Sequence, residues 1–413
     1  MEVIKKHKVL ILLILFLFTG FLGRYEYKMP KRNFADFNVY YYTAQKLIEK
    51  GNIYDDAAYR KEKVANFKYP PVIAFLFYPL GFLEQNAAAI TWFTINFILI
   101  IAFFFWSSRL IFDQKLSSRS KNWIYFLASL FTLRFFAHNF DEGQVNFLMM
   151  SMLTLSLFYL GRKKHFLSGL SLGFSALVKY MSFIFVPYFL FKKRFKVFFY
   201  FLVALIIFTV LPGLFLGFKY NSFLQKSFLP FLCKTSLDFN SLSTHENQSL
   251  IAMLIRYFSS FSEYSVNFLK LNMLHLGILI GSAATFIYMF IFCPTDKFKK
   301  NCPFLEAINY AMIFICVALF NPNGWIHAFI FLVFPYLTVL FYLFKTKHKD
   351  KLVWAMVAVS VILGSWPESL FLPSIKDSVD IYSLLTIGSI ILFFALVKIK
   401  FFPLESSQEH NHE

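Results

Sequence analysis

The feature that most constrains this chain is a series of apolar runs that approach the length of a membrane span. Ile95–Trp106, Val197–Phe218 and Ile381–Val397 contain no charged residue. A helix needs about 20 predominantly apolar residues to cross a hydrocarbon core, and a soluble protein would have to expose runs of this kind. Only 15% of the residues are charged, compared with roughly a quarter in soluble domains. The chain is therefore predicted to be an all-α polytopic membrane protein.

The formal net charge of +18 is distributed in a way that argues against a nucleic-acid partner. Basic residues fall in short clusters between the apolar runs, at Lys5–Lys8, Lys115–Lys121, Arg162–Lys164, Lys192–Lys196, Lys297–Lys300 and Lys345–Lys351. This is the positive-inside pattern of membrane proteins, and it differs from a basic groove interleaved with base-stacking aromatic residues. The partners expected from composition are membrane lipids, and no nucleic acid.

Placing the basic clusters in the cytoplasm orders the chain. The apolar run nearest the N-terminus, Val9–Leu22, resembles a signal peptide but lacks a small-residue cleavage site. It is therefore predicted to be an uncleaved first span. We expect a first outer loop at 24–69, a second at 219–247, and a cytoplasmic tail at 399–413. The whole chain, 1–413, is predicted to be one membrane domain with about 10 to 13 spans at roughly 20 residues each. Its N- and C-termini are both predicted to be cytoplasmic.

Two segments are predicted not to cross fully. Pro70–Leu83 is short, and counting it as a span would place the next basic cluster outside, so we interpret it as re-entrant or shallow. Phe166–Phe191 lies between two basic clusters and is predicted to be a hairpin of two short helices with Lys179 near its apex. A lysine at membrane depth is normally paired or functional. The alternative is that Lys179 extends its ammonium to the interface.

Other polar residues fall at the predicted outer face, and each has a structural alternative. Asp36 lies among aromatic residues, where partial burial would favour general-base chemistry, but Asp is also a preferred helix N-cap. Gln144 and Asn146 either cap a helix or hydrogen-bond a sugar. His327 begins a span, where a helix N-terminus favours anions, or is an interfacial histidine without a role. The chain has no Asp-x-Asp motif and no His/Cys ligand spacing, so neither a metal nor a cofactor is predicted.

These elements occur in an order that resembles a known family. The pattern is Asp36…Tyr40-Tyr41, Gly51…Tyr54-Asp55, Tyr69-Pro70-Pro71 with Pro79, Gly143-Gln144-Val145-Asn146, Gly169…Lys179, Asn247-Gln248-Ser249-Leu250 and Asn321-Pro322…Trp325…His327. Over residues 30 to 345 the chain resembles glycosyltransferase family 87, the polyprenyl-phosphate-sugar-dependent transferases typified by mannosyltransferases. The sequence departs from the family pattern after Lys179, where a proline is expected, and in the turn at Asn321 and Gly324.

The resemblance implies a GT-C-like helical bundle with a large first extracytoplasmic loop, and an inverting hexosyltransferase. Its donor would be a polyprenyl-phosphate-linked sugar, in the first place mannose, and its acceptor a lipid-linked or envelope glycan. The reaction would take place at the outer face of a bacterial cytoplasmic (inner) membrane. Asp36 would be the catalytic base. The donor phosphate would be bound by Lys179, His327, Arg134 and His138, and the sugar or acceptor by Tyr40, Tyr69, Gln144, Asn146, Asn247 and Gln248.

Two other classes of protein are compatible with a polytopic bundle. A transporter or flippase of lipid-linked sugars would also need polar residues inside the bundle. Such transporters often carry paired repeats with broken helices at mid-membrane, whereas this chain shows no repeat and its polar residues lie on one side. A purely structural membrane subunit leaves Asp36 and Lys179 without a role. The transferase interpretation is therefore favoured.

Overall fold

The structure of the chain is a computed structural model that describes residues 19–20, 22–23, 35–112, 116–235, 242–266, 268–298, 302–365 and 373–404. The side chains of 231–235 and 373–376 are outside this description. The described residues form α-helices and short 3₁₀-helices, and no strand among them is present. The predicted all-α class is therefore confirmed.

Helices long and apolar enough to cross a membrane confirm the polytopic architecture. Among the described residues there are five, at Gln85–Ile111, Phe195–Leu216, Met273–Phe292, Ile326–Lys345 and Leu384–Phe401. A sixth is possible if the bent pair Leu133–Glu142 and Asn146–Gly161 counts as one span. The predicted total of about 10 to 13 is not reached by full-length spans in this part of the chain. Shorter apolar helices lie at Pro71–Phe82, His165–Val178, Tyr180–Phe191, Pro303–Leu319 and Lys351–Gly364. The first three belong to segments 70–83 and 166–191, which are not predicted to be full spans.

The described chain divides into two compact units. Unit 2 comprises the described residues up to Ser107 and from Ala137 to Thr235, and unit 1 comprises Ser108–Phe136 and the described residues from Leu242 onward. Helix α6 (Gln85–Ile111) and helix α8 (Leu133–Glu142) each contain a boundary between the units. The prediction of a single domain stays a prediction.

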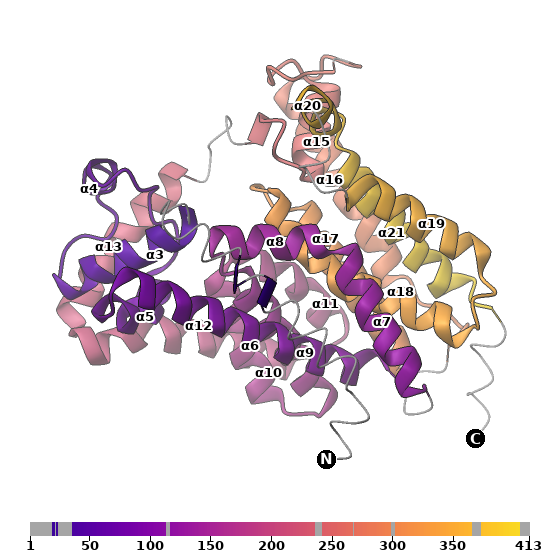
Figure 1. Cartoon of the computed structure of the whole chain (residues 1–413), viewed down its shortest axis with the longest axis horizontal. Coiled ribbons are helices and arrows are strands. Elements are labelled where there is room, and N and C mark those ends of the chain that lie inside the picture. The colour runs from indigo at the N-terminus through magenta and orange to yellow at the C-terminus, as the bar shows by residue number, and fades with distance from the viewer. Residues whose placement is uncertain are drawn as a thin grey trace. The chain divides into compact units, whose positions relative to one another are not determined.

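Apart from residues 19–20 and 22–23, the described part of unit 2 starts at Ala35 with helix α3 and ends with helix α13 (Figure 1). Its elements are α3 (Ala35–Ile48), α4 (Asp56–Lys61), α5 (Pro71–Phe77), the 3₁₀-helix η2 (Tyr78–Phe82), most of α6, α9 (Asn146–Gly161), α10 (His165–Val178), η3 (Tyr180–Phe185), α11 (Val186–Phe191), α12 (Phe195–Leu216) and α13 (Phe218–Thr235). Helix α10 packs between α9 and α12. The close packing of α10 against α12 requires glycine at two positions of α10. A Cβ at Gly169 would lie 2.5 Å from the Tyr200 Cβ, and one at Gly173 would lie 2.6 Å from the Ala204 Cβ.

Unit 1 contains the most completely buried helices of the chain. Its elements are α7 (Ser118–Phe131), α15 (Leu250–Phe258), α16 (Met273–Phe292), α17 (Pro303–Leu319), η4 (Ile326–Leu332), α18 (Val333–Lys345), α19 (Lys351–Gly364), α20 (Pro373–Ile381) and α21 (Leu384–Phe401). Helices α17 and α18 are buried along almost their whole length. Helices α19 and α21 run side by side (Figure 1), and a Cβ at Gly388 would lie 2.9 Å from the Ser360 carbonyl oxygen.

The two segments predicted not to cross fully have short helices. The segment 166–191 folds as α10 followed by η3 and α11, with Lys179 at the junction as the C-cap residue of α10. The segment 70–83 folds as α5 and η2, with Pro71 at the first turn of α5, where a missing N–H costs little. The re-entrant or shallow placement of 70–83 and the hairpin at 166–191 stay predictions.

Candidate active site

The site is organised by one glutamine that joins a carboxylate to a lysine within unit 2. The Gln144 side-chain amide donates a hydrogen bond to an Asp36 carboxylate oxygen. The Gln144 carbonyl oxygen accepts a hydrogen bond of 3.1 Å from the Lys179 ammonium. Gln144 is buried, whereas Asp36 and Lys179 are each partly exposed. The arrangement holds an accessible carboxylate and an accessible cation one side chain apart.

The turn before α9 explains why Gln144 can reach Asp36. Helices α8 and α9 are bent by 120° at a break of a few residues, and Gly143 in that break has φ +67°. A Cβ at Gly143 would lie 2.6 Å from the Phe37 Cβ, so the turn contacts the first turn of α3 directly. The Trp92 indole N–H donates a hydrogen bond of 2.7 Å to the Gly143 carbonyl oxygen and fixes the turn from α6. Glycine is needed here both for its backbone angle and for the close approach.

We therefore expect Gly143→Ala to disturb the site as well as the fold. The added Cβ would be strained at φ +67° and would collide with Phe37, at a cost of about 1 to 3 kcal/mol. The midpoint of thermal unfolding should fall, and the activity of the site should fall with it because Gln144 is displaced. Gly161→Ala, at the end of α9 where nothing lies within 4 Å of an added Cβ, is the matched control. Equal unfolding midpoints and equal activity for the two variants would contradict this account.

Two tyrosines adjoin Asp36. The hydroxyls of Tyr40 and Tyr69 lie 3.1 Å apart, and their rings meet edge to face with centroids 5.6 Å apart. Tyr40 is fully buried on α3, one turn after Asp36, and Tyr69 is partly exposed before α5. Burial, together with the neighbouring Asp36 carboxylate, raises the pKa of both phenols above its ordinary value. Both hydroxyls therefore stay protonated at neutral pH and can serve as hydrogen-bond donors.

The electrostatics of Asp36 suit a base. Burial raises the pKa of the Asp36 carboxyl above the ordinary 3.8, and this is the largest influence on it. The Lys179 ammonium, the hydrogen bond from Gln144 and the nearby Lys68 oppose that rise without cancelling it. A carboxylate with a raised pKa has greater affinity for a proton, which is the property a general base needs.

The alternative capping roles fit this site less well. Asp36 lies in the first turn of α3, where a carboxylate is favoured by the helix dipole, but the hydrogen bond described for its side chain comes from Gln144. The N-cap residue of α9 is Val145, which makes no side-chain capping bond. Asn146 is the first residue of α9 and donates a hydrogen bond of 2.9 Å to the Asn139 side chain. The side chains of Gln144 and Asn146 therefore contact other side chains.

A second set of predicted residues forms a network within unit 1. The Asn247 side chain donates to the Pro322 carbonyl oxygen at 2.6 Å and accepts from the Gly324 N–H at 3.1 Å. The Gln248 side chain donates to the carbonyl oxygens of His245 and Asp380, both at 2.8 Å. Both residues are almost fully buried. The Asn247 bonds attach the 321–324 turn to the segment before α15, and the Gln248 bonds attach that segment to α20. The described role of both side chains is therefore to position backbone. Their predicted contact with sugar or acceptor stays a prediction.

The other predicted donor-binding residues lie on two helices. Arg134, in the part of α8 that belongs to unit 1, is partly exposed and donates to the Gly364 carbonyl oxygen at 3.5 Å. His138 follows on α8 in unit 2 and is partly exposed. His327 is partly exposed in the first turn of η4, directly after the turn that Asn247 holds. Their roles at a donor phosphate stay predictions.

Arg256 was not among the predicted residues, although it is fully buried in unit 1. Its guanidinium donates to the carbonyl oxygens of Thr244, Asn247 and Ile381 and to the Ser383 hydroxyl, at 2.6 to 3.2 Å. It therefore supports the backbone on which Asn247 stands. Its position inside the apolar helix α15 could have identified it from the sequence, since a charged side chain at such a position is costly unless it is paired. Among the described residues, no cluster of three or more His, Cys, Asp or Glu side chains is placed to hold a metal ion.

A comparison with models of protein families gives a match. The model of glycosyltransferase family 87 matches residues 67–322, which is more than half of the 413 residues. The chain belongs to this family. It is therefore a glycosyltransferase, and with its apolar helices it is a multi-pass membrane glycosyltransferase. No curated protein and no solved structure matches it.

The family match covers part of the candidate site. Gln144, Lys179 and Tyr69 of this glycosyltransferase fall inside residues 67–322, whereas Asp36 and Tyr40 precede them. The resemblance predicted from the sequence extends over residues 30 to 345, a longer stretch than the family model matches. The contact from Gln144 to Asp36 is what connects the matched region to the acidic residue before it.

Proposed function

We propose that this family 87 enzyme moves a hexose, with mannose as the first candidate, from a polyprenyl-phosphate-linked donor to a lipid-linked or envelope glycan. The anomeric configuration is inverted. The observation that carries the proposal is the Asp36–Gln144–Lys179 arrangement, because it pairs a proton acceptor with a cation in one accessible place. A lipid-phosphate donor needs that pair and needs no nucleotide pocket.

The chemistry assigns a role to each side chain. Asp36 takes the proton of the acceptor hydroxyl as its oxygen attacks the anomeric carbon, because a neutral hydroxyl attacks poorly. The bond between that carbon and the phosphate oxygen breaks, and the polyprenyl phosphate leaves with the electron pair. Lys179 stabilises the negative charge that grows on the phosphate. His327, Arg134 and His138 are proposed as further partners of that phosphate.

Gln144 is proposed to set the distance between base and cation, and its remaining hydrogen-bonding capacity is available to the sugar. The protonated hydroxyls of Tyr40 and Tyr69 are proposed to donate to sugar or acceptor oxygens. Asn146 has the same proposed role through its carboxamide. Asn247 is proposed to contribute by holding the turn before His327, and Gln248 by fixing the segment before α15 to α20, in addition to any direct contact with the glycan.

The test of donor class is a transfer assay with the enzyme in membranes or in detergent. Radiolabelled polyprenyl-phosphate mannose and polyprenyl-phosphate glucose are compared with a nucleotide-linked sugar as donor. We expect transfer from a polyprenyl-phosphate sugar and none from the nucleotide sugar. Transfer from the nucleotide sugar alone would overturn the proposed donor class.

The same assay tests the prediction that the reaction needs no divalent metal. The chain has no Asp-x-Asp motif, and we propose that Lys179 provides the cation that a metal supplies in other transferases. Transfer is therefore expected to continue at an unchanged rate in EDTA. Loss of transfer in EDTA, with recovery on adding magnesium or manganese, would contradict this prediction.

We propose that the reaction takes place at the outer face of the cytoplasmic membrane, with both termini inside. The proposal rests on the positive-inside distribution of the basic clusters. In a background without native cysteines, Asn52→Cys should react with an impermeant thiol reagent in intact cells. Lys347→Cys should react only after permeabilisation. Reversed labelling would place the Asp36 site on the cytoplasmic side and overturn the topology.

A further inference from the structure

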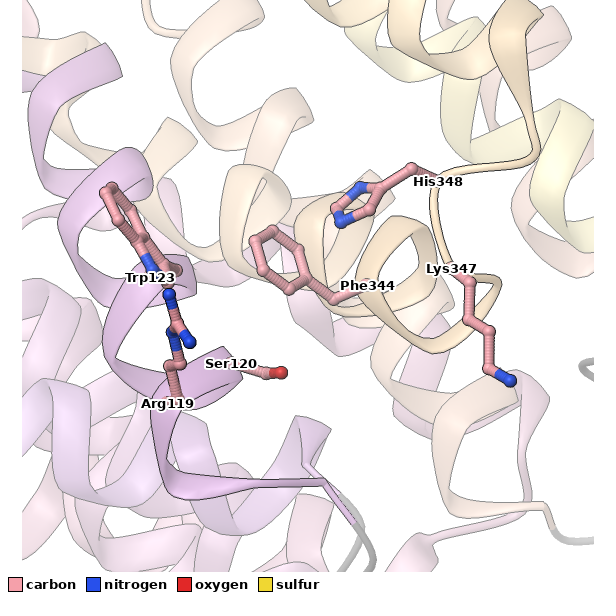
Figure 2. Close-up of a pocket in the computed structure, with 6 residues that line it drawn as sticks. All are labelled: Arg119, Ser120, Trp123, Phe344, Lys347 and His348. Carbon is pink, nitrogen blue, oxygen red and sulfur yellow. The ribbon is translucent and has the colours of Figure 1, made fainter.

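A basic hollow lies within unit 1 and uses none of the residues assigned above to transfer. It has a volume of about 450 Å³ and is open to the surface. Its lining consists of Arg119, Ser120, Trp123, Phe344, Lys347 and His348 (Figure 2). Three of these side chains are basic, two are aromatic, and none is acidic. This combination suits a ligand with one anionic and one apolar part.

The hollow is built where α7 begins and where α18 ends. Ser117 caps α7, with its hydroxyl oxygen accepting from the Ser120 N–H at 3.1 Å. After α18, Lys347 and His348 both adopt the left-handed conformation, and the His348 N–H donates to the Leu343 carbonyl oxygen at 2.8 Å. That turn brings the His348 ring edge to face with Phe344, with ring centroids 4.6 Å apart.

The residues from α7 and those from the end of α18 lie on opposite sides of the hollow (Figure 2). Figure 2 shows Arg119 and Trp123 on α7, with Phe344 and His348 projecting toward them from the end of α18. Lys347 lies at the rim, and its ammonium points away from the centre. A lysine side chain is long and flexible enough to return over a bound anion. The aromatic rings form an apolar wall beside the cationic groups.

The positive charge of the hollow is not neutralised by the acidic residue that follows it in sequence. Asp350 is buried, accepts a hydrogen bond of 2.7 Å from the Tyr342 hydroxyl, and contacts the Lys398 ammonium. Its carboxylate is therefore already engaged. The hollow also lies between two of the basic clusters, Lys115–Lys121 and Lys345–Lys351. The local potential therefore favours an anion.

The hollow lies at the level where lipid headgroups are expected. It is at the end of the apolar span Ile326–Lys345, where basic residues replace apolar ones. Trp123 is 48% exposed, and tryptophan is enriched at the boundary between headgroups and hydrocarbon. Basic pockets at such positions attract anionic lipids.

We propose that this hollow binds the phosphate of an anionic phospholipid, with Arg119 and Lys347 contacting the phosphate and Trp123 and Phe344 packing against the glycerol and first methylenes. Guanidinium groups bind phosphate oxygens through paired hydrogen bonds. The lipid would bridge α7 and the end of α18. The proposal depends on the chain being embedded in a membrane and does not depend on the role of Asp36.

The test measures lipid binding to the full chain purified in detergent. Retention is followed by native mass spectrometry during titration with phosphatidylglycerol or with phosphatidylcholine. A parallel arm uses glycerol 3-phosphate and inorganic phosphate, which carry the same anion without acyl chains. Arg119→Gln/Lys347→Gln is compared with Arg194→Gln/Lys163→Gln. The control removes the same two charges at exposed positions, and Lys163, like Lys347, has a left-handed backbone.

We expect the parent to retain phosphatidylglycerol in preference to phosphatidylcholine. Arg119→Gln/Lys347→Gln should bind phosphatidylglycerol at least tenfold more weakly, since each cation near a lipid surface contributes about fivefold. The control should stay within twofold of the parent. Phosphatidylglycerol brominated near its headgroup should quench tryptophan fluorescence less in Trp123→Phe than in the parent.

Three results would overturn the proposal. Equal losses in the two double variants would mean that net charge alone attracts the lipid. Equal retention of phosphatidylglycerol and phosphatidylcholine would remove the role of the anion. Equal affinity for glycerol 3-phosphate and phosphatidylglycerol would identify a free phosphate as the ligand in place of a lipid. None of these readouts uses sugar transfer, so they are independent of the proposed donor and acceptor.

Discussion

Asp36→Asn is expected to lower the rate of sugar transfer by about 10² to 10⁴, because a positioned general base typically contributes that much. Asparagine keeps the size of the side chain and can still accept the hydrogen bond from Gln144. What is lost is the carboxylate that takes the proton. Donor binding should be retained, since Lys179 and the two tyrosines are unchanged. Single-turnover transfer and equilibrium donor binding, measured on the purified variant, separate the two effects.

The control for this variant is Glu49→Gln, directly after α3, which removes an exposed carboxylate that pairs with Lys46. It should transfer sugar at the parental rate. Asp36→Asn should elute as a monodisperse species and unfold at a temperature close to that of the parent. In the parent, transfer should decline as the pH falls through the pKa of Asp36, which burial places above the ordinary 3.8. Transfer by Asp36→Asn within a few-fold of the parent would mean that Asp36 is not the base, and Asp141 or Glu142 would be tested next.

The helical architecture was predictable because lipid imposes one strong requirement on sequence. Apolar length determines where a span can lie, so the run Val197–Phe218 corresponds to α12 at Phe195–Leu216. The short helices on either side of Lys179 were predictable because basic clusters bracket this apolar segment. Their arrangement as a hairpin with Lys179 at its apex stays a prediction. The number of full spans was harder to predict, because apolar composition does not reveal where an α-helix changes to a 3₁₀-helix. Such a change occurs between α5 and η2.

The candidate site was predictable as a set of residue types and not as an arrangement. Asp36, Gln144 and Lys179 each stood out as polar residues near apolar segments. Their connection depends on the bend at Gly143, whose positive φ and contact with Phe37 arise only in the folded chain. The burial of Arg256 likewise depends on four backbone and hydroxyl oxygens, two of which, from Ile381 and Ser383, lie far away in the sequence. Local sequence patterns carry no information on such pairings.

Lys179→Met is expected to weaken donor binding and turnover together, which distinguishes it from Asp36→Asn. Methionine preserves the length and apolar stem of the side chain and removes the ammonium that donates to Gln144. The phosphate loses a charge-assisted contact in the ground state. It loses more in the transition state, where negative charge grows on the leaving oxygen, and loss of one such stabilising group typically costs about 10² to 10³ in turnover.

Two further variants make the cause of that loss measurable. Lys164→Met removes the same charge from the exposed N-cap position of α10, the helix whose other end carries Lys179, and should leave donor binding and turnover unchanged. Lys179→Arg keeps a cation at the site and should recover donor binding more fully than turnover, because the planar guanidinium cannot occupy the position of the ammonium. Equal donor binding and equal turnover for Lys179→Met and Lys164→Met would contradict the proposed role of Lys179. Lys179 would then be a lysine that extends its ammonium to the membrane–water interface, and the leaving phosphate would need another cation. Arg134, His138 and His327 would then be the residues to vary, each in an otherwise parental enzyme.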